Sequence, residues 1–377
     1  LALGGAITQD SFRGTGNRVS FGLTRSEYQS NYNFGFVDPY WTMDGVSLGY
    51  NVFYNKTDYD DADYDITSYS VDTLGAGVSI GYPISETSSL NYGLTASQDS
   101  LSSGTYTVPS ILEFMANNGG DYTEADFTNV KASIGWGEST LNRGILPNRG
   151  YSQSVTLQTT VPAASDLEFY KLDYRGQHFT PLSKQTALRL HTELGYGDGF
   201  GDTDGLPFYE NYFAGGISSV RGFRNGSLGP RAVASLAFPN ISSNPNQLPN
   251  YDPVTGIYQC NPATGICTDP DQDDQPFGGN VMITGGVDYL FPLPFIKDQS
   301  SLRTTFFVDV GNVFSTNCDD FQVDCNSPDL GDLAVSTGFG LTWITAMGPL
   351  GFAIATPIKE PDNSDPQFFQ FTLGQTF

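Results

Sequence analysis

One arginine stands out because glycines and aromatic residues surround it in a chain with few cations. Arg221 lies within residues 199–279, a segment of roughly eighty residues that is too aromatic for a solvated tail. Asp288 and Asp309 follow on the polar faces of the next two alternating segments. A guanidinium suits paired bonds to carboxylates, and a buried charge must be paired. If the segment folds back inside, the pattern predicts an ion pair of Arg221 with both carboxylates. The alternative is an arginine on an exposed loop tip.

The chain offers little for nucleophilic catalysis. His178 and His191 are its only histidines, and His191 shares a polar stripe with Glu193. No serine stands out as a nucleophile beside them, so a polar histidine satisfied by its neighbours explains the pattern better than a hydrolase active site does. We therefore predict that the protein is not an enzyme. The sequence has no nucleotide motif and no metal constellation, so we expect no cofactor and no metal.

The four cysteines fall into two close pairs, Cys260 with Cys267 and Cys318 with Cys325. Each pair lies in a polar segment, and local pairing is the simplest of the possible connectivities. Disulfides would suit an oxidising compartment such as the periplasm or the cell surface. A zinc site is the rival interpretation, but the spacing is wrong for a zinc knuckle and no histidine lies nearby.

The net charge of −24 argues against a nucleic-acid partner, because nothing would offset repulsion from the phosphates. Acidic residues cluster in residues 58–65 and 269–274. Solvated loops explain both clusters. A divalent-cation site is the sharper alternative, but the first cluster lacks the glycine and the final glutamate of a calcium-binding loop.

The elements that position these side chains are strands, because apolar and polar residues alternate with a period of two. In residues 187–196, Leu190 and Leu194 share one face, and Arg189 and His191 share the other. An apolar face opposite a charged face is typical of a membrane barrel with a wet interior. A soluble sandwich would show the same period. Similar stripes occupy residues 46–54, 74–82, 90–94, 130–136, 155–161, 170–174, 281–291, 302–314, 335–343 and 350–354.

Three further features favour the membrane. Aromatic residues such as Trp41, Trp136 and Trp343 lie at strand ends, where interfacial girdles place them. Short and long connections alternate along the chain, and glycine is frequent within the strands. The sequence has no run of apolar residues long enough for a transmembrane helix. We therefore predict an all-β fold: residues 1–377 form one transmembrane antiparallel β-barrel with about fifteen strands.

The chain ends on an alternating strand, residues 368–377, that closes with an aromatic residue. Such an ending resembles the C-terminal signal of outer-membrane proteins, with the aromatic at the membrane interface. A glycine interrupts this strand and weakens its pairing, or merely relieves crowding. The apolar face and the glycine are Phe369, Phe371, Leu373, Phe377 and Gly374.

Several motifs together resemble the outer-membrane insertase superfamily, and the resemblance covers essentially the whole chain. The most specific is Val220, Arg221, Gly222 and Phe223 on the long loop. The others are residues 37–41 (VDPYW), 44–49 (DGVSLG), 195–199 (GYGDG), 207–211 (PFYEN), 307–312 (FVDVGN) and the terminal residues 369–377.

The resemblance implies a sixteen-stranded barrel preceded by periplasmic POTRA domains. The POTRA domains and most of the first strand are then expected to be absent from this chain. It further implies that the sixth loop, residues 199–279, folds into the lumen and that Arg221 packs there against Asp288 and Asp309. The first and last strands of the family pair weakly and form a lateral gate, so residues 369–377 would be the surviving half of that gate.

The function that the resemblance implies is folding and insertion of nascent outer-membrane β-barrel proteins, without nucleotide, in the outer membrane of a Gram-negative bacterium. The implied partners are those nascent proteins, the lipoproteins of the β-barrel assembly (BAM) complex, bound mostly through the absent POTRA domains, and lipid and lipopolysaccharide. The main alternative is a passive or gated channel, or a secretion pore of the same superfamily. A porin would need ladders of basic and acidic residues, and cations are scarce here.

Overall fold

A computed structural model gives the structure of the protein. It describes residues 3–26, 29–58, 69–104, 107–232, 235–236, 259–260, 267–268, 275–293, 296, 301–318, 322–323, 325, 327–345, 348–362 and 364–373. Strands predominate in these ranges, because alternating sequences of 7 to 16 residues recur between turn-forming segments. No helix in the described ranges is long and apolar enough to span a membrane.

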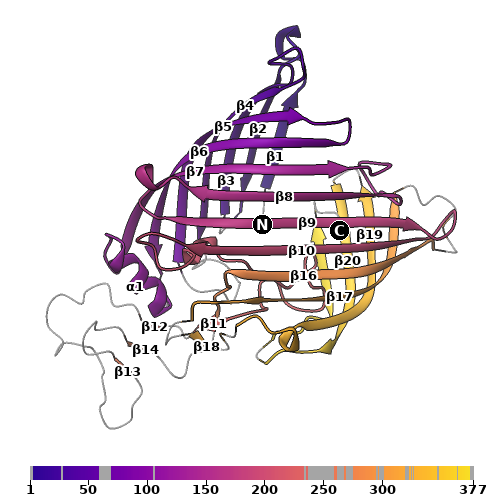
Figure 1. Ribbon diagram of the computed structural model, residues 1–377. Coiled ribbons are helices and arrows are strands. Elements are labelled where there is room, and N and C mark those ends of the chain that lie inside the picture. Colours follow the sequence, from indigo (N-terminus) through magenta and orange to yellow (C-terminus); the bar gives the residue numbers. More distant parts are fainter. Residues whose placement is uncertain are drawn as a thin grey trace.

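Fifteen strands form one antiparallel sheet, in which each strand pairs with its neighbour in the chain order β1-β2-β3-β4-β5-β6-β7-β8-β9-β10-β16-β17-β19-β20-β21. Figure 1 shows the sheet strongly curled. The strands are β1 (Leu3–Gln9), β2 (Arg18–Arg25), β3 (Gln29–Asp38), β4 (Ser47–Asp58), β5 (Tyr69–Pro83), β6 (Ser88–Ser103), β7 (Glu124–Ser139), β8 (Gly150–Thr160), β9 (Phe169–Pro181), β10 (Ala187–Gly199), β16 (Val281–Phe291), β17 (Leu302–Phe314), β19 (Ala334–Thr345), β20 (Gly348–Lys359) and β21 (Phe369–Leu373).

β1 and β21 are the two ends of this strand order. Within the described ranges, no ladder of hydrogen bonds joins them. Five described residues of β21 pair with β20, from Leu350 opposite Leu373 to Ile354 opposite Phe369, and residues 374–377 lie outside the described part of the chain. The predicted count of about fifteen strands and the antiparallel all-β fold are confirmed.

Side chains alternate between the outside and the inside of the curled sheet as the sequence predicts. Val308 on β17 is 37% exposed and Phe371 on β21 is 52% exposed, whereas Asp309 is fully buried. A water-soluble sandwich would place these residues the other way round, with the apolar side chains inside. The apolar faces therefore point outward and the charged faces line a lumen, as in a membrane barrel.

Alternate connections are long, and they gather at one end of the sheet. This long-loop end carries helix α1 (Pro109–Asn117) and the short strands β11 (Arg231–Ala232), β12 (Ser235–Leu236), β13 (Gln259–Cys260), β14 (Cys267–Thr268), β15 (Gln275–Pro276) and β18 (Gln322–Val323). They lie at the lower left of Figure 1. The 3-10 turns are η1 (Phe12–Gly14), η2 (Pro162–Ala164), η3 (Phe208–Glu210) and η4 (Leu330–Asp332).

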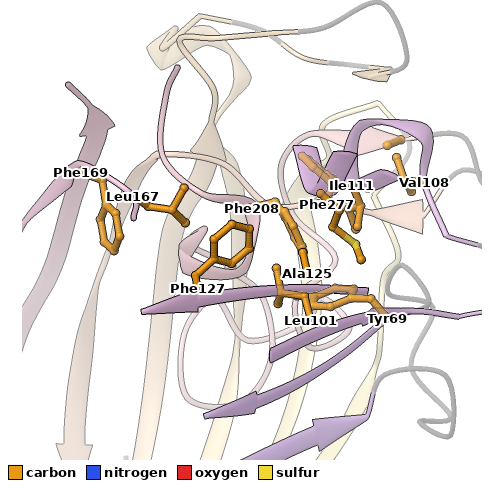
Figure 2. Packing of buried hydrophobic residues seen from close by; sticks show 12 residues of the cluster. Tyr69, Leu101, Val108, Ile111, Ala125, Phe127, Leu167, Phe169, Phe208 and Phe277 are labelled. Carbon is orange, nitrogen blue, oxygen red and sulfur yellow. The ribbon is translucent and has the colours of Figure 1, made fainter. Parts of the chain in front are cut away.

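The apolar core lies inside the barrel at the long-loop end. Phe208, from the loop between β10 and β16, packs edge-on against Tyr69 and Phe114, with ring centroids 5.0 and 5.4 Å apart. Figure 2 shows Phe208 between Phe127 of β7 and Ile111 of α1. The cluster packs loop six against the inner wall at this end, and it excludes water from the space that its aromatic side chains fill.

Candidate functional site

Arg221 lies deep in the lumen, on the loop of residues 200–280 that connects β10 to β16, which we call loop six. Its side chain is 4% exposed. Nε donates to Asp309 Oδ2 at 2.6 Å and Nη2 donates to Asp309 Oδ1 at 2.8 Å, which makes a two-point contact. Nη2 also donates to Asp288 Oδ1 at 2.6 Å. The backbone N–H of Arg221 adds a bond to Asp309 Oδ2 at 3.1 Å. One guanidinium therefore holds carboxylates of two neighbouring strands.

The strands present these carboxylates because of their register. Asp288 of β16 lies opposite Phe307 of β17, and Asp309 lies opposite Gly286. A Cβ at position 286 would come within 2.5 Å of Asp309 Oδ1, so glycine leaves the room that the carboxylate occupies. The Phe307 ring lies beneath Arg221, with 3.6 Å between the guanidinium carbon and the ring centroid. Stacking on an aromatic face favours arginine over lysine here.

A second arginine and a histidine complete the polar cluster. Arg189 on β10 donates from Nη1 to Asp288 Oδ2 at 3.1 Å. His191 Nε2 lies 3.6 Å from Asp309 Oδ1 and 3.8 Å from Asp288 Oδ2. His191, Asp288 and Asp309 come close enough to offer three metal-ligand atoms within 4.8 Å of one another. The guanidinium of Arg221 is the cation that binds the carboxylates in this arrangement, and the two arginines balance the two negative charges.

The residues around Arg221 fit the wall of the barrel closely. Val220 and Phe223 are fully buried, and the Ser336 hydroxyl on β19 donates to the Arg221 carbonyl. Gly222 has a φ of +93°, a conformation that glycine adopts without steric cost. This turn therefore lies flat against β19 and β20 instead of projecting into an open lumen.

Gln370 on β21 also contacts this turn, although it was not among the site residues predicted from the sequence. Its side chain is buried, whereas Phe369, Phe371 and Leu373 on either side of it are more than half exposed. Its carboxamide bonds to both Gly222 and Phe223. The sequence offers one sign of this role: Gln370 has a long amide side chain, whereas the other residues on the polar face of the last strand are small. Gly374 and Phe377 lie outside the described residues.

Loop six has a second ionic anchor on another part of the wall, at β7 and β9. Glu210 accepts from Lys131 Nζ of β7 at 2.5 Å and from Lys171 Nζ of β9 at 3.2 Å. Lys171 also lies over the Tyr212 ring, 4.6 Å from its centroid, and the Tyr212 hydroxyl donates to Asp173 at 2.9 Å. The sequence marks this segment as unusually aromatic, but it gives no sign of which residues pair with Glu210.

Burial alone would raise the pKa of the Glu210 carboxyl, but the charges of Lys131 and Lys171 outweigh it and hold that pKa below its usual value. A lowered pKa in the folded state means that the ionised form is the stabilising one. This stabilisation is therefore complete above the ordinary carboxyl pKa of about 4.3, and it is lost only as the pH falls through the lower folded-state value.

We expect Glu210→Gln to loosen the start of loop six at neutral pH, because two largely buried ammonium groups would lose their carboxylate. Removing one partner of a buried ion pair costs about 3–5 kcal/mol. The measurement is the rate of protease cleavage in residues 200–214 of the folded barrel. Glu193→Gln is the matched control, because Glu193 is 42% exposed and lies 3.7 Å from Arg175, and exposed pairs contribute about 0–1 kcal/mol. Equal cleavage of the two variants would contradict the anchor.

The cysteine pairs differ in how far the structure describes them. Cys318 and Cys325 form a disulfide within the loop that connects β17 to β19, as local pairing predicts. The segment they close contains β18, which pairs with β11 of loop six. The backbones of Cys260 on β13 and Cys267 on β14 lie opposite each other, and their side chains lie outside the described part of the chain. The acidic residues 59–65 and 269–274 also lie outside it.

Comparison with known sequences gives the family. The model of the Omp85 superfamily domain matches residues 11–377. The outer membrane protein assembly factor BamA of Neisseria meningitidis is 30% identical over 396 residues, which cover 100% of this chain and 45% of the relative. BamA of Nitratidesulfovibrio vulgaris is 21% identical, over 100% of this chain and 40% of the relative. The chain thus spans less than half the length of these curated relatives.

Solved structures agree with the sequence comparison. The crystal structure of BamA from Haemophilus ducreyi lacking POTRA domains 1-3 superposes with a TM-score of 0.80 at 30% identity, over 100% of this chain and 68% of that chain. CdiB from Acinetobacter baumannii has a TM-score of 0.55 at 12% identity, over 99% of this chain and 56% of that chain, and it shows the fold alone. The family, the fold and the location predicted from the sequence are confirmed. The chain belongs to the Omp85 superfamily and is an outer-membrane β-barrel of a Gram-negative bacterium.

Proposed function

We propose that this barrel promotes the folding and insertion of nascent outer-membrane β-barrel proteins at a lateral gate between its first and last strands, without nucleotide. The observation that carries the proposal is the end of the strand order. Among the described residues, β21 pairs only with β20, β1 pairs only with β2, and no ladder joins β1 to β21. The identity to assembly factors from other bacteria supports the same function.

The physical argument concerns the backbone of the incoming chain. An unsatisfied backbone N–H or C=O group costs several kcal/mol in hydrocarbon, so a strand cannot enter the bilayer alone. A weakly paired edge offers hydrogen-bond partners, and a nascent strand can pair there by β-augmentation before it meets lipid. Phe369, Phe371 and Leu373 already face outward and would lie beside the entering strand. Gly374 and Phe377 would complete this gate and the C-terminal signal.

In this proposal the turn formed by Val220, Arg221, Gly222 and Phe223 holds loop six inside the lumen. Asp288 and Asp309 are its partners on the wall. A docked loop keeps the lumen filled while the seam opens sideways, so insertion need not create a pore. The same docking argues against a permanently open channel. Large, stable, selective conductance in single-channel recordings would favour the channel or the secretion pore instead.

The proposed partners follow from this function. Nascent outer-membrane proteins would pair at the seam, and lipid and lipopolysaccharide would contact the apolar outer face. The lipoproteins of the BAM complex would bind mostly through POTRA domains, which the described barrel does not contain. These partners remain proposals, because the matched relatives are more than twice as long as this chain.

The test is a covalent lock across the seam. A cysteine replaces Thr372 on β21, and cysteines replace the residues of β1 (Leu3–Gln9) one at a time until a pair oxidises. In cells that have no other copy of the protein, oxidation should stop the insertion of outer-membrane proteins, and reduction should restore it.

The matched control is a disulfide between β20 and β21, for which Gly351 and Thr372 lie opposite each other. This disulfide joins β20 to β21, two strands that stay paired in the proposed mechanism, so it should leave insertion intact. Full activity of the oxidised β1–β21 variant would refute the gate. Equal loss of activity in both locked variants would point to rigidity of β21 in general rather than to the seam.

A further inference from the structure

Gln370 places a donor and an acceptor against two consecutive residues of loop six. Its Oε1 accepts from the backbone N–H of Gly222 at 3.1 Å, and its Nε2 donates to the carbonyl of Phe223 at 2.7 Å. A carboxamide that bonds both ways reproduces the bonding of a peptide group in a β-ladder. The side chain is 5% exposed, so opening of the contact would deprive the Gly222 N–H and the Gln370 Oε1 of each other in a buried site. The Phe223 carbonyl would keep the Gly216 N–H at 2.9 Å, and the Gln370 Nε2 would keep the Gln367 Oε1 at 3.4 Å.

Backbone pairing beside Gln370 extends the same contact. The N–H of Gln367 donates to the carbonyl of Gly222 at 2.8 Å, and the N–H of Arg224 donates to the carbonyl of Asp365 at 2.8 Å. Phe223 and Pro366 form an isolated antiparallel bridge. The residues immediately N-terminal to β21 therefore pair with loop six, and the residues of β21 that follow them pair with β20.

Loop six can approach the wall closely because the side chains of the wall are small there. Ala353 and Ala355 on β20 are almost fully buried, and their side chains lie on the lumen side of the strand that β21 pairs with. A Cβ at position 222 would lie 3.1 Å from the Ala355 Cβ. Larger residues on β20 would push the loop away from Gln370.

We propose that Gln370 is a positioning residue that couples loop six to the last strand. The described part of the strand pairs with β20 at five positions, and the carboxamide of Gln370 adds a contact from inside the lumen. The coupling is reciprocal: undocking of the loop loosens β21, and loosening of β21 exposes the loop. The functional importance of this coupling rests on the proposed function, because β21 is one side of the proposed gate.

The test is amide hydrogen exchange of the folded protein in detergent, followed by mass spectrometry of peptides that cover residues 220–224 and 369–373. Gln370→Leu removes both bonds, and exchange in both peptides should accelerate at least tenfold. Gln158→Leu is the matched control, because Gln158 is a half-buried residue of β8 that lines a lumen cavity of about 370 Å³, and that cavity is lined by no residue of either peptide. It should leave both peptides unchanged. Unchanged exchange in Gln370→Leu would overturn the proposal.

Gln370→Glu separates this bonding role from mere filling of space. An ionised carboxylate can still accept from Gly222, but it repels the carbonyl of Phe223, so exchange at neutral pH should be fast. A protonated carboxyl restores the donor, and exchange at acidic pH should return to the wild-type rate. Arg221, Arg224, Arg231 and Asp365 also carry charge near this contact, and the ratio of variant to wild-type rates at each pH removes their shared effect. A ratio that does not change with pH would contradict the bonding role.

The two proposals can fail separately. Exchange is measured without any substrate protein, so it reports the coupling alone. If exchange accelerates as expected while Gln370→Leu inserts outer-membrane proteins at the wild-type rate, the coupling stands and the gate proposal fails. If insertion falls while exchange is unchanged, the coupling fails and the gate proposal is unaffected.

Discussion

Arg221→Ala should free loop six from the lumen wall. The substitution removes three side-chain hydrogen bonds and leaves the Asp309 carboxylate, which is fully buried, without its cation. Asp288 would keep Arg189, at 3.1 Å. Breaking a buried pair from one side costs about 3–5 kcal/mol, which corresponds to a shift of more than about a hundredfold in the docking equilibrium. Protease cleavage of loop six in intact cells and the insertion of outer-membrane proteins measure the effect.

Arg175→Ala provides the matched control for Arg221→Ala. Arg175 on β9 also faces the lumen, but its side chain is 73% exposed and its partner Glu193 lies 3.7 Å away. Because exposed pairs contribute about 0–1 kcal/mol, this variant should leave cleavage near the wild-type rate. Adding Asp309→Asn to Arg221→Ala should recover part of the loss, because the variant then buries no unpaired charge there. Equal cleavage of Arg221→Ala and Arg175→Ala would show that the ion pair does not hold the loop.

Gly222→Ala should displace the same turn by a different physical route. The backbone of Gly222 has a φ of +93°, and an added Cβ would lie 3.1 Å from the Ala355 Cβ and 3.2 Å from the Ser336 Cβ. The left-handed conformation costs a non-glycine residue about 1–2 kcal/mol. Overpacking adds about 1–3 kcal/mol. The sum should lower resistance of the folded barrel to guanidinium and speed cleavage of loop six.

The Gly222 experiment has a control and a rescue. Gly14 has a φ of +77° and nothing within 4 Å of an added Cβ, so Gly14→Ala carries the backbone cost without the packing cost. Ala355→Gly in the Gly222→Ala background removes the nearest contact and should restore part of the docking. If Gly222→Ala and Gly14→Ala behaved alike, the close fit of the turn to β19 and β20 would be unimportant.

Much of the wall could be predicted because a membrane strand shows its two faces in the sequence. Val308 and Asp309 are adjacent, and lipid on one side and water on the other require opposite chemistries at adjacent positions. The period of two therefore gives both the strand and the direction of each side chain. β21 begins at Phe369, one residue after the predicted start of the strand 368–377, and residues 374–377 of that prediction lie outside the described part of the chain.

The candidate site could be predicted only in part. The sequence suggested Arg221, Asp288 and Asp309 because charged residues are scarce and those three lie in distinctive surroundings. It did not suggest Gln370 or the partners of Glu210, because Gln370 is 147 residues from Phe223 and Glu210 is 79 residues from Lys131 along the chain. No short-range pattern reports such pairs.

By itself, the sequence determined the alternation of faces, the short and long connections, and hence an outer-membrane barrel with Arg221 on an unusually long loop. Only the tertiary structure decided where that loop docks. Arg221 binds carboxylates of β16 and β17, Glu210 binds lysines of β7 and β9, and Gln370 of β21 bonds to the turn that follows Arg221. The reason is physical. A face is fixed locally by whether each residue meets lipid or water, whereas a docking position depends on curling of the sheet, which brings distant strands around one lumen.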